Sequence, residues 1–186
     1  MINTSTLQME VKTTINIDVG SITRQLLSAN IMRNLYDSRW KNAPLGWGEL
    51  KVQVGCGRQA SHTHTAAKLI LDGCEYTDIL GNTRIAKGMY VNIDKSRYAN
   101  LMRDEMSKIE GDWIQRDIED QPMMIDSFKR ESFLGRTFEC DFIVIDMGLW
   151  GINPSQSRKA CDFVDAFMSR YHAGHFPNLK SVLILQ

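Results

Sequence analysis

Hydrophobic and polar positions form segments along this chain, and their period switches between that of a strand and that of a helix. The stretch "LQMEVKTTINIDV" near the start alternates as a strand or extended arm does. The next stretch, "SITRQLLSANIMRNLYDSRW", predicts an amphipathic helix that begins behind a capping Ser21. Its expected buried stripe consists of Ile22, Leu26, Leu27, Ile31 and Leu35. We therefore assign residues 1–20 to an N-terminal strand or arm and residues 21–186 to a single α/β domain.

A strand, a glycine loop and a helix follow in direct succession. "KNAPLGWGE" predicts a loop, "LKVQV" a strand, and "GCGRQASHT" leads into the helix-forming "HTAAKLIL", which ends at Asp72 and Gly73. The glycines and asparagine of "CEYTDILGNTRIAKG" favour an insertion or loop. The strand "MYVNI" comes next, with Asp94 at its end, and a helix is expected from about Ser96 to Ile109.

The second half contains the clearest strand of the chain. No element is predicted between Gly111 and Arg136, where periodicity is weakest. "DFIVIDM" is a nearly continuous apolar run closed by an acid, which is typical of a central parallel strand covered on both sides. "NPSQSRKACDFVDAFMSRYH" then predicts a helix and "SVLIL" a last strand.

Alternating strands and helices predict an α/β fold, a three-layer sandwich with a mostly parallel sheet and right-handed crossovers. Ligands of such sheets bind outside the carboxyl ends of the strands. The glycine loop, Asp94, Asp146 and Gln186 would all lie at that edge. We therefore expect residues that are distant in sequence to converge on one site.

Composition narrows the function classes. The 186 residues are 43% hydrophobic, enough for one core, and 22 Lys and Arg balance 22 Asp and Glu. This neutrality excludes a global attraction to nucleic acid or membrane, so any nucleic-acid contact would be a local patch. The cysteines are scattered, there is no N-terminal apolar segment typical of a secretory signal, and no apolar run approaches a transmembrane length. We expect a cytoplasmic protein without membrane contact.

The glycine loop has the layout of a phosphate-binding loop. Such loops, G-x-x-x-x-G-K-[ST], surround phosphate with backbone N–H groups, while the lysine reaches the outer phosphates and the hydroxyl holds Mg²⁺. The loop resembles the "RQ-x-G-K-T" form of phage terminase ATPases, with Ser61 at the second glycine, His62 at the lysine and Thr63 at the hydroxyl. Cys56 falls at the first glycine. The resemblance implies nucleotide binding by Gly55, Gly57, Arg58, Gln59, Ser61, His62 and Thr63, at the edge that Asp94 shares.

A second resemblance lies around the apolar strand. "GRTFECDFIVIDM" resembles the Walker B region of terminase, helicase and PhoH-like ATPases, whose strand ends in a Mg²⁺-holding acid followed by an acid that polarises water. Asp146 matches the first acid and Met147 replaces the second. Gln186 follows the next strand, where these families carry a polar sensor residue. The resemblance therefore implies Asp146 and Gln186 as catalytic residues and Thr63 and Asp146 as metal ligands.

Together these likenesses imply a degenerate P-loop NTPase. Methionine cannot serve as a general base, and loss of the loop lysine removes charge stabilisation from phosphoryl transfer. We expect a weakly or non-hydrolytic domain that binds ATP or another nucleotide with Mg²⁺. Its role would be that of an accessory subunit in a viral or phage nucleic-acid-processing assembly, in the host cytoplasm, with protein partners that include copies of itself.

Two alternatives stay open. "VQVGCG" also resembles motif I of S-adenosylmethionine-dependent methyltransferases, which need no lysine, and Asp94 would then bind the ribose of that cofactor. The other alternative is a scaffold or assembly protein that binds no small molecule. A zinc site formed by Cys56 with His62, His64, His172 and His175 is a weaker hypothesis, since the spacing fits no standard finger. Cys140 and Cys161 are expected to be core residues.

Overall fold

The computed structural model describes residues 18–40, 43–55, 62–91, 97–110, 123–125, 134–146 and 154–185. Side chains are described for residues 18–37, 43–55, 62–91, 102–109, 134–145 and 162–185. The predicted arm at residues 1–17 lies outside these ranges.

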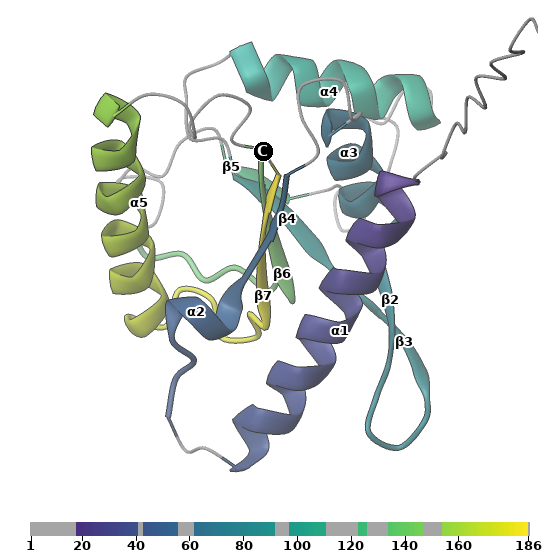
Figure 1. Ribbon diagram of the computed structural model, residues 1–186, viewed down its shortest axis with the longest axis vertical. Helices are drawn as coiled ribbons and strands as arrows, with labels where there is room; N and C mark the ends of the chain where they lie inside the picture. The colour runs from purple at the N-terminus through teal and green to yellow at the C-terminus, as the bar shows by residue number, and fades with distance from the viewer. Residues whose placement is uncertain are drawn as a thin grey trace, which may run out of the picture.

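Helices and strands are interspersed along the described chain (Figure 1). The helices are α1 (Val19–Trp40), α2 (Trp47–Leu50), α3 (His62–Asp72), α4 (Arg97–Glu110) and α5 (Pro154–His172). The strands are β1 (Lys51–Val54), β2 (Cys74–Thr77), β3 (Thr83–Ala86), β4 (Gly88–Val91), β5 (Met123–Ile125), β6 (Phe142–Asp146) and β7 (Ser181–Leu185).

Five strands form one parallel sheet in the order β1-β7-β6-β4-β5. Every neighbouring pair in this sheet is parallel, which confirms the predicted α/β class. Strand β6 lies at the centre of the order, as its uninterrupted apolar sequence predicted. The last strand in sequence, β7, inserts between β1 and β6.

The two sides of the sheet bury separate cores. In β6, Ile143 and Ile145 belong to the cluster shared with α2 and α5, whereas Phe142 and Val144 belong to the cluster shared with α1, α3 and α4. This alternation follows from the two-residue period of a strand. Figure 1 shows the same division, with α5 on one side of the sheet and α1 and α3 on the other. Helices therefore cover both sides, as predicted.

Helix α1 differs from its prediction in its cap and in its buried stripe. The cap is Asp18, whose Oδ1 accepts a hydrogen bond from the Ser21 backbone N–H at 3.1 Å. Ile22 and Leu26 are exposed, although their spacing with Leu27 and Ile31 predicted burial. Buried polar residues replace them: Thr23, Asn30 and Asn34.

The buried asparagines explain this orientation of α1. Asn30 Nδ2 donates to the Leu50 carbonyl at 3.0 Å and to Ser181 Oγ at 2.8 Å. Asn34 Nδ2 donates to the carbonyls of Glu49 at 2.9 Å and Lys180 at 2.6 Å. These bonds connect α1 to the amino ends of β1 and β7, and buried amides are stable only when bonded in this way.

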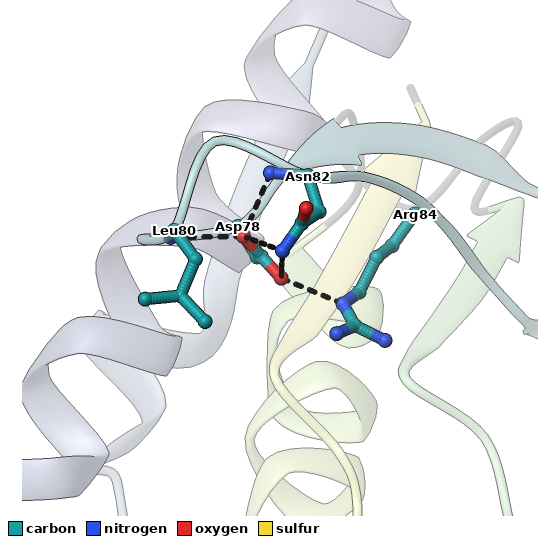
Figure 2. Close-up of polar contacts among 4 residues, drawn as sticks. All are labelled: Asp78, Leu80, Asn82 and Arg84. Carbon is teal, nitrogen blue, oxygen red and sulfur yellow. Dashed lines mark hydrogen bonds and ion pairs between the residues drawn. The ribbon is translucent and has the colours of Figure 1, made fainter.

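The segment predicted as an insertion or loop is a β-hairpin. Strands β2 and β3 pair antiparallel, with Cys74 opposite Ala86 and Thr77 opposite Thr83. Figure 2 shows how Asp78 organises the turn: Oδ1 accepts from the backbone N–H groups of Leu80 and Asn82, both at 2.9 Å, and Oδ2 accepts from Arg84 Nε at 2.7 Å. A second element that the sequence did not predict is the three-residue β5, which pairs with β4.

Candidate functional site

The carboxyl edge of the parallel sheet brings the two predicted landmarks to one level. Val54, the last residue of β1, is in register with Leu185 of β7, and Leu185 is also in register with Asp146 of β6. The ends of β1 and β6 therefore lie at the same edge of the sheet, with β7 between them. Two strand spacings separate the outer residues by about 10 Å.

The glycine loop connects β1 to α3 at this edge. Gly55 follows β1 and is exposed, and the next described residue, His62, begins α3. Helix α3 has 11 residues and ends at Asp72, and the following Gly73 has a φ of 75°, which suits a helix terminator, as predicted. The first N–H groups of a helix have no partner within it and attract anions. The described residues therefore show a strand that ends at Val54 and a helix that begins at His62, on either side of the glycine segment.

His62 supplies an unpaired polar atom at the start of α3. Its Nε2 is shielded from solvent and has no hydrogen-bond partner among the described residues. Buried polar atoms in native proteins are almost always paired, so this nitrogen is a candidate contact for a ligand. Thr63, the predicted hydroxyl ligand, occupies the next position of the same helical turn.

His64 contributes to a different contact on the same helix. Its Nδ1 lies 2.8 Å from Glu105 Oε1 of α4, and Lys108 Nζ lies 3.1 Å from Glu105 Oε2. The hydrogen bond with His64, followed by that with Lys108, lowers the pKa of the Glu105 carboxyl below its ordinary value. This contact stabilises the packing of α4 on the first turn of α3, near the glycine loop.

Sequence reasoning missed Glu105 because it sought acids only at strand ends. The available signal is the periodicity of α4. Met102 and Met106 are both buried, so Glu105 flanks the side of α4 that packs on α3.

Six of the predicted site residues lie outside the described residues: Gly57, Arg58, Gln59, Ser61, Asp94 and Gln186. Asp146 is placed by its backbone at the end of β6, and its side chain is outside the described part. The structure therefore brings Gly55, His62, Thr63 and the Asp146 backbone to the same edge. Strand β4, which precedes Asp94, lies on the other side of β6 from β7.

The zinc hypothesis is not supported by the placement of the histidines. His172 ends α5, before β7 begins, so it lies toward the amino edge of the sheet, whereas His62 lies at the carboxyl edge. His175 Nδ1 lies 2.6 Å from the Arg136 carbonyl, also at the amino edge. Within the described ranges, no three His, Cys, Asp or Glu residues are grouped closely enough to hold a metal ion.

The described cysteines are core residues. Cys74 and Cys140 are buried and unpaired, and burial is the main cause that raises the pKa of Cys74 to about 11 and that of Cys140 to about 12. Both therefore stay protonated and unreactive near neutral pH. This confirms the core interpretation for Cys140, whereas the side chain of Cys161 lies outside the described part.

Comparison of the chain with known protein families, with curated proteins and with solved structures finds no significant match in any of the three. Across the described residues, none of the helices combines the length and apolar character that crossing a bilayer requires.

Proposed function

We propose that this domain binds the phosphate chain of a nucleoside triphosphate, with Mg²⁺, at the carboxyl edge of its sheet and hydrolyses it slowly or not at all. The observation that carries the proposal is the common level of Val54, Leu185 and Asp146 on three adjacent parallel strands. It supports a site in which the glycine loop and the acid act on one ligand. Crevices at the carboxyl ends of such strands are where α/β sheets bind ligands.

The start of α3 supports the choice of phosphate as the ligand. A helix N-terminus offers unpaired N–H groups and a partial positive charge, which attract an anion even without a lysine. His62 Nε2 adds a shielded atom that needs a partner. In the tautomer that carries its proton on Nε2, this nitrogen would donate to a phosphate oxygen.

The same residues argue against rapid turnover. His62 replaces the lysine that normally stabilises charge on the transferred phosphoryl group, and Met147 replaces the acid that polarises water. Asp146 retains the metal-holding role that the resemblance assigns to it. Backbone N–H groups therefore bind the nucleotide, whereas the absence of the lysine and of the second acid weakens its hydrolysis.

The methyltransferase alternative receives less support from the strand order. In Rossmann-like sheets the acid that binds ribose follows a strand adjacent to the glycine-loop strand. Here β4, the strand before Asp94, is three positions from β1, which corresponds to about 14 Å. One ligand at the glycine loop would therefore reach the end of β6 more readily than the end of β4.

The proposed biological role is that of an accessory subunit in an assembly that processes nucleic acid. This part of the proposal rests on the terminase-like and helicase-like motifs alone. The balanced charge of the chain is compatible with contact through protein partners and a local patch.

Titration calorimetry with ATP and Mg²⁺, and separately with S-adenosylmethionine, tests the proposal. We expect heat from ATP only, weaker binding when Mg²⁺ is removed, and phosphate release far slower than the roughly 1 s⁻¹ typical of slow kinases. Asp146→Asn should abolish the Mg²⁺ dependence, while Asp165→Asn, an exposed site on α5, should leave it intact.

Each contrary result selects another function. Heat from S-adenosylmethionine alone would establish the methyltransferase alternative, and no heat from either ligand at millimolar concentration would leave the scaffold alternative. Turnover at ordinary ATPase rates would refute the expected loss of catalysis.

A further inference from the structure

We draw no further inference here: the strongest candidate, the exposed apolar side chains of Ile79, Leu80 and Ile85 on the hairpin of β2 and β3, carries no proposal because nothing in the described part of the structure shows what covers them.

Discussion

Val54 and Asp146 lie at one level of the sheet because both are in register with Leu185, which lies between them. Because β7 pairs in parallel with both β1 and β6, the carboxyl ends of β1 and β6 point the same way. This relationship is the geometric basis of the proposed nucleotide site. Its chemistry depends mainly on the residues that begin α3.

The first prediction concerns the residue at the lysine position of the loop. His62→Lys should tighten ATP binding by about tenfold, because an ammonium group adds a permanent charge that reaches phosphate. His172→Lys is the matched control, since it makes the same change at the amino edge, and it should leave the affinity unchanged. Calorimetric titration of the three proteins measures both effects. Equal affinities in all three would show that His62 does not face the phosphate.

The second prediction concerns the contact between α3 and α4. Glu105→Gln should lower the free energy of unfolding at pH 7 by about 0.5 kcal/mol, the typical value of a partly exposed ion pair. Asp104→Asn, an exposed carboxyl on the same helix, is the control and should have a smaller effect.

The pH dependence of that contact has a definite sign. The pKa of folded Glu105 is lowered, so the unfolded state binds its proton first as the solution is acidified. The contribution is therefore complete above the ordinary pKa of 4.5 and is lost as pH falls through the lower folded value. Urea unfolding at pH 7 and pH 3 should show the gap between wild type and Glu105→Gln closing in acid. A gap that widens in acid would contradict this assignment.

The third prediction concerns the hairpin turn in Figure 2. Asp78→Ala removes the acceptor for the N–H groups of Leu80 and Asn82, so amide hydrogen exchange should accelerate across β2 and β3. The hydrogen bond from Arg84 is the largest cause that holds the pKa of Asp78 well below its ordinary 3.8. Protection in the wild type should consequently persist at pH 4 and fail only in stronger acid. Glu75→Ala, on an exposed position of β2, should leave exchange unchanged.

The fourth prediction concerns the contact between β4 and β6. A Cβ atom at Gly88 would overlap with Phe142 Cζ, too close for the buried ring to remain in place. Gly88→Ala should therefore destabilise the fold by about 1–3 kcal/mol, as overpacked cores do. A Cβ atom at Gly48 would meet no neighbour within 4 Å, so Gly48→Ala should change stability by less than about 0.5 kcal/mol. Denaturant midpoints that are equal for the two variants would refute the close packing.

The elements that the sequence predicted best are those whose own residue pattern indicates which sides are buried. Strand β6 is apolar on both sides because both sides are covered, and α3 combines a helical sequence with a terminating Gly73. The strand order was not predictable in the same way. Parallel strands pair according to how their helices cross over, so nothing in "SVLIL" indicated insertion beside β1.

The missed features depend on contacts between distant residues. The buried side of α1 is partly polar because Asn30 and Asn34 bond to carbonyls of other elements, and periodicity alone favoured Ile22 and Leu26. The hairpin depends on the hydrogen bond between Asp78 and Arg84 across its turn. The glycine and asparagine residues of this segment favoured a loop instead. At the site, Glu105 was missed for a similar reason, since its partner His64 is 41 positions away.

Strand β6 contributes alternate residues to the two cores, Phe142 and Val144 to one and Ile143 and Ile145 to the other. Neither helical layer can detach without exposing a strand on which the opposite layer depends. Heat should consequently melt the two layers together, and calorimetry should record one transition whose van't Hoff and calorimetric enthalpies agree.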